Sequence, residues 1–271
     1  MTEEDFDRLQ QLLASRAGFR LTRDRIHLAE HRLGPVARRE GFDSVDAMLA
    51  SLWARPVASL GWAIIETLLN PETWFRRDRT PFDTLTRELL PAIGHVRPGG
   101  LVRLWSAGCG TGQEAWSLAM AAGDAGANVE IVATDLSQRA LERARAGAYT
   151  TFEIQRGLSA ASMLRWFEPV EEQWAAHPDL KSKVTFARAN LLDEPAGEAR
   201  FDIIFCRNVL SDMEPARRSG VIEALERRLV DDGCLFVGAD ERLEGDSIAF
   251  RPVSGRRGLF VKAPSSLSRA A

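Results

Sequence analysis

The chain has 271 residues, of which 45% are apolar, so it is long enough for one large domain or two modest ones with a full core. Charged residues make up 27% and leave a net charge of −3, so no overall basic bias indicates a nucleic-acid-binding protein. The three cysteines stand in apolar surroundings without a Cys-x-x-Cys pair, and the four histidines are few, which argues against a zinc site and a disulfide framework.

The first residues, Met1 to Phe6, are acidic and lack the apolar centre of a signal peptide. No apolar run approaches the ~18 residues of a transmembrane helix. The cysteine usage suits a reducing compartment. We therefore expect a cytoplasmic protein that binds no metal and does not insert into a membrane.

Residues 1 to about 70 have the pattern of a helical region. Thr2 is a plausible cap for a first helix that ends at Gly18. A second helix is predicted from about Thr22 to Leu33, where Gly34-Pro35 is expected to stop it, with a short helical turn on to Arg39. Two further helices are predicted over about 44–52 and 57–69.

The second helix and the residues after it are rich in arginine. These side chains form either a solvated face, which is the usual fate of such charges, or a docking surface for an acidic partner helix, and the sequence leaves both open. The residues concerned are Arg23, Arg25, Arg32, Arg38 and Arg39.

A polar connection containing Pro71 follows the helical region. Its aromatic pair, Trp74 and Phe75, suggests a segment folded back onto the rest of the protein. Another helix is predicted over about 81–93, and the turn at 97–100 leads into the first strand.

The stretch from Leu101 to Glu114 predicts a buried strand, a glycine-rich turn and the start of a helix. Gly108, Gly110 and Gly112 stand at alternate positions, a spacing typical of loops that wrap S-adenosylmethionine. The next strand ends in Asp135, and 135 − 112 = 23 residues is close to the ~20 expected for an acidic ribose ligand. The alternative is that Asp135 caps the helix that starts near Ser137.

The remaining chain continues the alternation of strands and helices. Helices are predicted over 138–146 and 215–229, strands over 184–187, 201–206 and 233–238, and an antiparallel pair over 250–253 and 258–261. This order predicts a parallel sheet whose ligands bind at the carboxyl ends of its strands. The glycine loop, Asp135, Asn190 and Asn208 all fall at such ends.

Several segments together resemble the CheR-type glutamate O-methyltransferases of bacterial chemotaxis, from about residue 4 to 262. The most specific is Phe205-Cys206-Arg207-Asn208-Val209-Leu210, which matches the Phe-Cys-Arg-Asn-Val box of that family. The others are 72–78, 111–117, 144–149 and 190–193.

The resemblance implies a class I methyltransferase-like (Rossmann-like) mixed α/β sheet with helices on both faces, preceded by an all-α N-terminal domain and carrying a small β insertion. The domains it implies are a helical receptor-docking domain (1–72), a linker and cofactor-lid segment (73–98), a methyltransferase domain (99–263) with an inserted subdomain (149–182), and a disordered tail (264–271).

The resemblance also implies roles for individual residues around S-adenosylmethionine and its product S-adenosylhomocysteine. Thr73 and Arg77 would contact the carboxylate end of the cofactor or flank the methyl group, and Glu114 would hold the amino group. Asp135 would hold the ribose, Asn190 and Leu191 would frame the adenine, and Asn208 would lie at the reacting centre. The docking residues would be Arg25, Arg32, Arg38 and Arg39, and the partners would be chemoreceptor cytoplasmic helices or other chemosensory proteins, bound by a monomer.

Three departures from the family pattern concern the reaction edge. Asp212 stands where the family has a tyrosine, and Tyr149 is the only tyrosine in the chain. Arg76 replaces an expected phenylalanine, Asn70-Pro71 shifts the usual asparagine, and the run 238–241 replaces Gly-x-Ser-Glu. Asp212 could repel an incoming glutamate by about 4 kcal/mol for unit charges ~4 Å apart at an effective dielectric of about 20, unless Arg76 compensates it.

Three functions are therefore compatible with the sequence. The first is an active glutamate methyltransferase, with Arg77, Asn208 and Asp212 at the catalytic edge. The second is a methyltransferase with a different acceptor, for which Asp212 would be a candidate base. The third is a regulatory or scaffold protein that binds S-adenosylmethionine or S-adenosylhomocysteine with weak or no turnover.

Overall fold

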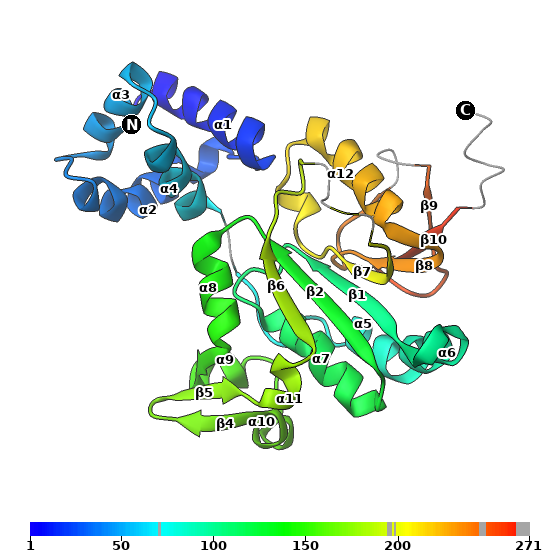
Figure 1. The fold of residues 1–271 in the computed structure, drawn as a ribbon. Helices are drawn as coiled ribbons and strands as arrows, with labels where there is room; N and C mark the ends of the chain where they lie inside the picture. Colours follow the sequence, from blue (N-terminus) through cyan, green and yellow to red (C-terminus); the bar gives the residue numbers. More distant parts are fainter. Residues whose placement is uncertain (70–71, 194–196, 198, 244–247, 264–271) are drawn as a thin grey trace. The chain divides into compact units, whose positions relative to one another are not determined.

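The computed structural model describes residues 1–69, 72–193, 197, 199–243 and 248–263 (Figure 1). Its contacts divide the chain into a helical unit, residues 1–70 with 212–218, and a sheet unit, residues 71–211 with 219–271. The tail expected to be disordered, 264–271, lies outside the described residues. No helix in the described ranges is long and apolar enough to cross a membrane.

The helical unit contains α1 (Glu3–Ala17), α2 (Ile26–Arg39), α3 (Val45–Ala54) and α4 (Ala58–Leu68). The cap predicted for α1 is confirmed, because the Thr2 hydroxyl accepts from the Asp5 N–H and the Asp5 side chain bonds back to residue 2. Gly18 ends the helix in a left-handed conformation with φ 66°. These local signals mark the two ends of α1.

The predicted end of the second helix at Gly34-Pro35 is wrong, because α2 continues through both residues to Arg39. Proline in a helix interior lacks an N–H donor and costs about 3 kcal/mol. Beyond it, however, Val36 and Ala37 are buried with Leu33, and burying a large apolar side chain gains about 1.5–3 kcal/mol. Tertiary packing therefore outweighs the local stop signal.

Residues 212–218 complete the helical unit, although they come from the other half of the chain. Phe19 and Met213 form an antiparallel bridge. The Arg20 N–H donates to the Asp212 carbonyl over 2.8 Å, and the Glu214 N–H donates to the Gly18 carbonyl over 2.7 Å. This segment includes the start of α12 (Pro215–Arg228).

The sheet unit is built on a mixed seven-stranded sheet in the order β6-β2-β1-β7-β8-β10-β9. Its first five strands are parallel and the last two antiparallel. The strands are β1 (Val102–Ala107), β2 (Val129–Asp135), β6 (Val184–Arg188), β7 (Phe201–Phe205), β8 (Leu229–Phe236), β9 (Phe250–Pro252) and β10 (Leu259–Lys262). The predicted Rossmann-like sheet is confirmed.

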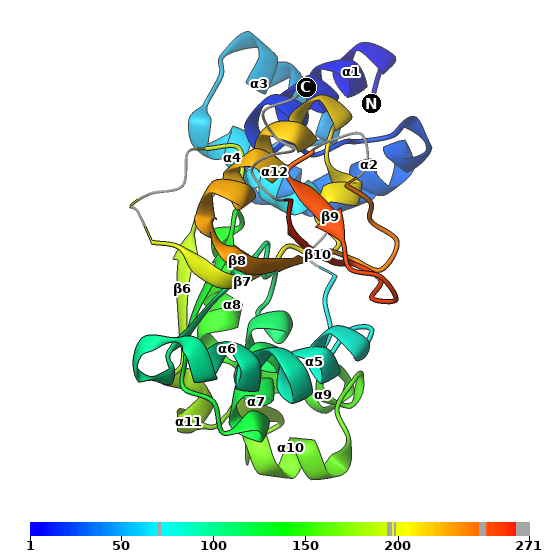
Figure 2. The same ribbon diagram turned by 90° about the vertical axis from the view of Figure 1, so that its right-hand side faces the viewer.

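Helices cover both faces of this sheet (Figure 2). On one face lie α5 (Thr80–Thr84), α6 (Leu90–Val96) and α7 (Gln113–Ala125), with a π-helical turn over Leu85–Leu89 between α5 and α6, and α12 lies on the other. Every residue of α7 from Gln113 to Ala122 is buried, and so is all of β7. The helix that follows β2 is α8 (Gln138–Ala146).

A second sheet, β3-β5-β4, is inserted between α8 and β6, where the sequence predicted an insertion (Figure 1). The strands of this sheet are β3 (Ala148–Thr150), β4 (Phe167–Val170) and β5 (Gln173–Ala176). The insertion also contains the short helices α9 (Thr151–Gln155), α10 (Ala160–Trp166) and α11 (Pro178–Lys181). The ring of Phe75 packs edge-on against Tyr149 and Phe167, with centroids 5.1 and 5.3 Å away. The connection at 72–78 is thereby attached to the insertion.

Candidate active site

The glycine loop after β1 requires glycine at two of its positions. Gly108 has φ 80° and Gly112 has φ 96°, both in the left-handed region. A Cβ on Gly108 would lie 2.6 Å from a methyl carbon of Val209, and one on Gly112 would lie 2.8 Å from the Cβ of Ala144. The backbone of the loop therefore packs too closely for any other side chain.

The only tyrosine supports the same loop. The Tyr149 hydroxyl donates to the Thr111 carbonyl over 2.7 Å. Its ring is fully buried, and burial raises the pKa of this phenol above its ordinary range. Tyr149 thus anchors the glycine loop through this hydrogen bond.

Asp135 ends β2 beside the glycine loop. One carboxylate oxygen accepts the Gly110 N–H over 2.8 Å and the other accepts the Ser137 N–H over 2.9 Å. The N-cap of α8 is Ser137 itself, whose hydroxyl accepts the Ala140 N–H. Asp135 therefore joins the loop to the helix, and a carboxylate at the end of this strand is the kind of group that accepts from ribose hydroxyls.

Asn190 and Leu191 follow β6 at the same edge. The Ala189 N–H donates to the Asp135 carbonyl over 3.1 Å, which places these residues next to the end of β2. The Asn190 side-chain oxygen accepts the Leu192 N–H, and Leu191 is half-buried. An amide beside an apolar side chain is a suitable boundary for adenine.

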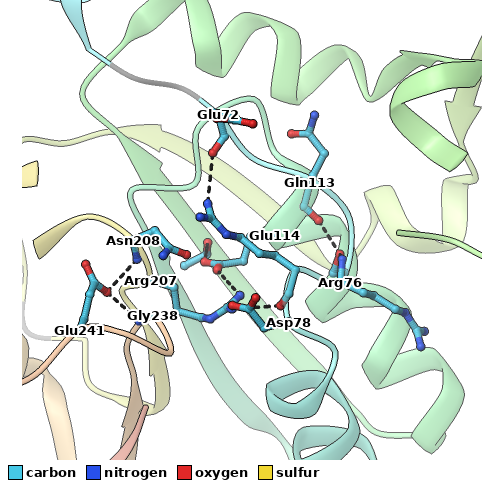
Figure 3. A network of polar contacts seen from close by, with 12 residues as sticks. Glu72, Arg76, Asp78, Gln113, Glu114, Arg207, Asn208, Gly238 and Glu241 are labelled. Atoms are coloured by element: carbon cyan, nitrogen blue, oxygen red, sulfur yellow. Dashed lines mark hydrogen bonds and ion pairs between the residues drawn. The ribbon is translucent and has the colours of Figure 1, made fainter. Parts of the chain in front are cut away.

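Arg207 is the centre of a buried polar network, shown in Figure 3. Arg207 comes just after β7, and its side chain is only 1% exposed. It donates to the Asp78 carboxylate over 2.6 Å, to the Arg77 carbonyl over 3.0 Å and to the Glu114 carboxylate over 3.4 Å. One guanidinium group thus joins the 72–78 segment, the start of α7 and the end of β7.

Sequence analysis assigned no role to Arg207, although the residue stands in the family's most specific motif. A signal was present. Arg207 directly follows a strongly apolar strand, and an arginine buried at such a place needs carboxylate partners. Which carboxylates those are, Asp78 and Glu114, depends on the fold alone.

Glu114 lies in the first turn of α7, and its carboxylate is buried. It accepts from the Ser106 hydroxyl over 2.8 Å on one oxygen and from Arg207 on the other. Burial raises the pKa of Glu114, and the neighbouring Arg207 guanidinium opposes that rise only in part. Such a carboxylate gains stability from a cation, and an amino group is one.

The 72–78 segment approaches the network in a strained conformation. Arg76, Asp78 and Arg79 all have positive φ, at 47°, 65° and 42°. Positive φ is costly for side-chain-bearing residues and is concentrated at functional sites. The carbonyl of Phe75 also packs against Gly157, where a Cβ would lie 1.9 Å from its oxygen, so the strained turn is fixed by the insertion.

Arg76 lies in the sheet unit, where another carboxylate pairs with its charge. Its guanidinium donates to Asp124 over 2.6 Å, and its N–H donates to the Ser117 hydroxyl over 2.9 Å. Arg76 therefore attaches the segment to α7. Asp212 belongs to the helical unit, where its carboxylate lies 3.9 Å from Arg25.

Arg77 lies over the ring of Trp74, with its guanidinium carbon 4.1 Å from the ring centroid. Arg156 lies over the same ring at 4.2 Å and also pairs with Glu72 over 2.9 Å. Burial lowers the pKa of Arg77, but arginine stays cationic in proteins. Thr73 is half-buried one residue before this stack.

Asn208 has an unpaired buried acceptor. Its side-chain oxygen is buried and has no hydrogen-bond partner within the described ranges. An unpaired buried acceptor costs about 1–3 kcal/mol, so a ligand with a hydrogen-bond donor would relieve it. The structure thus joins Glu114 and the Arg77 backbone to Arg207, with Asn208 as the next residue of the chain, while the place of Asp212 at the reaction edge stays a prediction.

The predicted docking arginines lie in or beside α2. Arg32, Arg38 and Arg39 are on the helix, and Arg25 precedes it in a short 3-10 turn, Arg23–Arg25. Arg32 and Arg39 are seven residues apart, about two turns, so they lie on one side of α2. Arg39 also pairs with Glu40 over 2.9 Å.

The charged side chains described above fit the chemical groups of S-adenosylmethionine. Glu114 suits its ammonium, Arg77 its carboxylate and Asp135 its ribose. The buried Asn208 side-chain oxygen has no hydrogen-bond partner within the described ranges, so it can accept from a ligand. No single residue identifies the compound, but together they match its ends and its middle.

Comparison with known proteins points in the same direction. The family model "CheR methyltransferase, SAM binding domain" matches residues 71–259. The chain is 32% identical over 268 residues to "Chemotaxis protein methyltransferase Cher2" of Pseudomonas putida, which covers 96% of this chain and 98% of that protein. It is 32% identical to "Chemotaxis protein methyltransferase 1" of Pseudomonas aeruginosa, with 96% and 97% covered. It is 37% identical to "Probable biofilm formation methyltransferase WspC" of that species, with 98% of this chain and 63% of that protein covered.

Proposed function

The chain belongs to the CheR methyltransferase family, whose S-adenosylmethionine-binding domain it contains, and from this premise we propose that it methylates glutamate side chains on the cytoplasmic helices of chemoreceptors. The observation that carries the proposal is the Arg207 network. It gathers Glu114, Asp78 and the backbone of Arg77 at the carboxyl ends of parallel strands, beside the unpaired oxygen of Asn208.

Each residue of the site has a binding or positioning task in this reaction. When bound, S-adenosylmethionine supplies a methyl group on a sulfonium, and that methyl becomes the methyl ester of the glutamate as the carbon–sulfur bond breaks. Glu114 holds the ammonium and Arg77 the carboxylate, Asp135 takes the ribose hydroxyls, and Asn190 with Leu191 frames the adenine. Arg207 keeps Glu114 and the 72–78 segment in place through its hydrogen bonds.

No general base is needed for a glutamate acceptor. A glutamate with its ordinary pKa of about 4.3 is already ionised near neutral pH. The site therefore acts by positioning the reactants, an effect worth up to ~7–11 kcal/mol in favourable cases. A glutamate acceptor therefore makes no demand for a catalytic dyad.

Recognition of the acceptor is assigned to the arginines of the helical unit. Arg32 and Arg39 share one side of α2, with Arg25 just before it and Arg38 exposed near its end. A receptor helix that carries methylatable glutamates is acidic, so these positive charges attract it. We propose that the docking takes place in the cytoplasm, where the receptor helices lie.

Transfer of a tritiated methyl group to a purified receptor cytoplasmic fragment tests the function. The expected product is a label that mild alkali releases as methanol, because carboxylate methyl esters are base-labile. S-adenosylhomocysteine should inhibit the transfer, and a fragment with its acceptor glutamates changed to glutamine or alanine should take up no label.

Two results would contradict the proposal. Binding of S-adenosylmethionine by calorimetry with no transfer to any receptor fragment would indicate the regulatory or scaffold function. Alkali-stable label would indicate a different acceptor group. A sample that binds neither S-adenosylmethionine nor S-adenosylhomocysteine would refute the assigned cofactor site as well.

A further inference from the structure

Glu241 accepts hydrogen bonds from three backbone N–H groups in the loops that follow β7 and β8. One carboxylate oxygen accepts from Asn208 over 2.8 Å and from Gly238 over 2.6 Å, and the other accepts from Ser211 over 2.8 Å. The first two bonds are drawn in Figure 3. The residue is 7% exposed, so these bonds are shielded from water.

One of the three residues bound by Glu241, Asn208, has an unusual backbone conformation. Asn208 has φ 59°, in the left-handed region, and its side-chain oxygen is buried without a partner in the described ranges. Asparagine tolerates this region better than most residues, but the conformation still needs support. The bond from its N–H to Glu241 supplies that support.

Gly238 allows the amide of Asn208 and the carboxylate of Glu241 to lie together. A Cβ on Gly238 would lie 2.7 Å from the Asn208 side-chain nitrogen and 2.9 Å from a Glu241 oxygen. The loop after β8 therefore contacts Asn208 in two ways. Glu241 accepts a hydrogen bond from its backbone, and Gly238 packs against its side chain.

We propose that Glu241 is a positioning residue for methyl transfer, which acts by fixing the loop 208–211 so that the Asn208 amide faces the reacting groups. The inference rests on the proposed function and adds to it a residue that touches neither cofactor nor acceptor. Only a carboxylate fits the task, because both of its oxygens accept. A glutamine would turn an N–H₂ group toward at least one of the backbone donors.

Glu241→Gln in the full chain tests the proposal, with Asp240→Asn as the matched control. Asp240 is the adjacent carboxylate, but its side chain is 96% exposed. For Glu241→Gln we expect kcat to fall by about 100-fold, the size of effect that a misplacement of about 1 Å produces. We expect the Kd for S-adenosylhomocysteine to change less than about threefold, since Glu114 and Asp135 are untouched, and we expect Asp240→Asn to behave like the wild type.

A double-mutant cycle separates positioning from general support of the fold. If Glu241 acts through Asn208, the variant with both Glu241→Gln and Asn208→Ala should be no slower than Asn208→Ala alone. Independent losses that multiply would overturn the proposal. So would a Glu241→Gln enzyme with unchanged kcat, or one whose loss of rate matches its loss of S-adenosylhomocysteine affinity.

Hydrogen exchange provides a measurement that does not depend on activity. In Glu241→Gln the amides of 208 and 211 should exchange at least tenfold faster, while those of β1 and β7 keep their protection. Unchanged exchange at 208 and 211 would overturn the proposal even if the wild type transferred no methyl group. A wild type without transfer but with this exchange pattern would refute the proposed function and leave the positioning role standing.

Discussion

At the scale of single residues, a buried cation and a buried carboxylate form the centre of the proposed site. Arg207 donates hydrogen bonds to Asp78, the Arg77 carbonyl and Glu114. Its charge is shared between two carboxylates, and the pKa of Glu114 stays raised by burial. Removing one partner of such a buried pair costs several kcal/mol. An ammonium group bound beside Glu114 would supply a further positive charge, and this charge would stabilise the ionised carboxylate that burial disfavours.

This arrangement predicts that cofactor binding depends on pH through Glu114. Burial raises the pKa of Glu114, so a larger fraction is protonated in mildly acidic solution, and an ammonium group favours the ionised form. Affinity for S-adenosylmethionine should therefore rise as pH rises through the raised pKa, with release of a proton, and then level off. Calorimetry in two buffers of different ionisation enthalpy, between about pH 5 and pH 8, measures both effects.

Glu114→Gln should flatten this profile and weaken binding by roughly tenfold or more, from about 1.5–3 kcal/mol for a hydrogen bond to a charged group. Ser106→Ala is the matched control, since it removes a neutral partner of Glu114 and keeps the carboxylate. A variant that keeps the slope of the wild type would exclude Glu114 as the group responsible.

Asp212 carries a second prediction at this scale. A negative charge near an incoming glutamate opposes binding, and the Arg25 guanidinium, 3.9 Å from Asp212, offsets only part of that charge because both side chains are partly exposed. Asp212→Tyr should therefore raise the rate of methylation of a receptor fragment, and Asp212→Asn separates the effect of the charge from that of the ring. No gain in either variant would refute inhibition by Asp212.

At the scale of elements, α2 has room for a side chain at its glycine, whereas the glycine loop does not. Gly34 lies inside α2, and a Cβ there would meet only the guanidinium of Arg38 at 3.6 Å, an ordinary contact. Gly112 has φ 96°, and a Cβ there would lie 2.8 Å from Ala144. The first glycine lowers helix stability without a packing reason, whereas the second is required by the loop.

Gly34→Ala should stabilise the helical unit by about 0.8–1.0 kcal/mol, the difference in helix propensity between the two residues. For a unit of this size that corresponds to a rise in melting temperature of roughly 4–8 °C, measured by circular dichroism. Gly112→Ala is the contrasting variant and should lose stability and S-adenosylhomocysteine binding together. A Gly34→Ala protein that melts lower than the wild type would show that α2 needs glycine for a reason not visible in its contacts.

At the scale of the whole molecule, recognition and chemistry are assigned to two units that the chain enters more than once. The chain leaves the sheet unit after Ser211, contributes 212–218 to the helical unit and returns at Ser219. Because the docking arginines belong to one unit and the cofactor residues to the other, recognition of the acceptor and binding of the cofactor are separable by mutation.

Charge reversal of Arg32 and Arg39 to glutamate should therefore lower kcat/KM for a receptor fragment by tenfold or more at low salt and leave the Kd for S-adenosylhomocysteine unchanged. The loss should shrink as salt rises, because screening weakens the attraction in the wild type. Reversal of Arg87 and Arg251, exposed arginines of the sheet unit, is the matched control. Equal losses in both double variants would indicate a net-charge effect and no docking surface.

Much of the fold could be predicted from local patterns. The capping box at Thr2, the glycine spacing from 108 to 112 and the alternation of strands and helices each depend on neighbours in the chain, so the sequence displays them directly. The same holds for Asp135, Asn190 and Asn208, because any residue after a parallel strand lies at the ligand-binding edge. These features were available without coordinates.

The hydrogen-bond partners of the site residues could not be predicted from the sequence, because they depend on which parts of the chain become neighbours in the fold. Arg207 and Asp78 are 129 residues apart, and Glu241 reaches Asn208 across 33. The order β6-β2-β1-β7-β8 brings them together, and no local periodicity encodes it. The continuation of α2 through Pro35 has the same origin, since the burial of Val36 and Ala37 against other elements outweighs the local cost of proline. The sequence by itself thus determined the elements and the edge where ligands bind, whereas only the tertiary structure decided how the buried charges at that edge are paired.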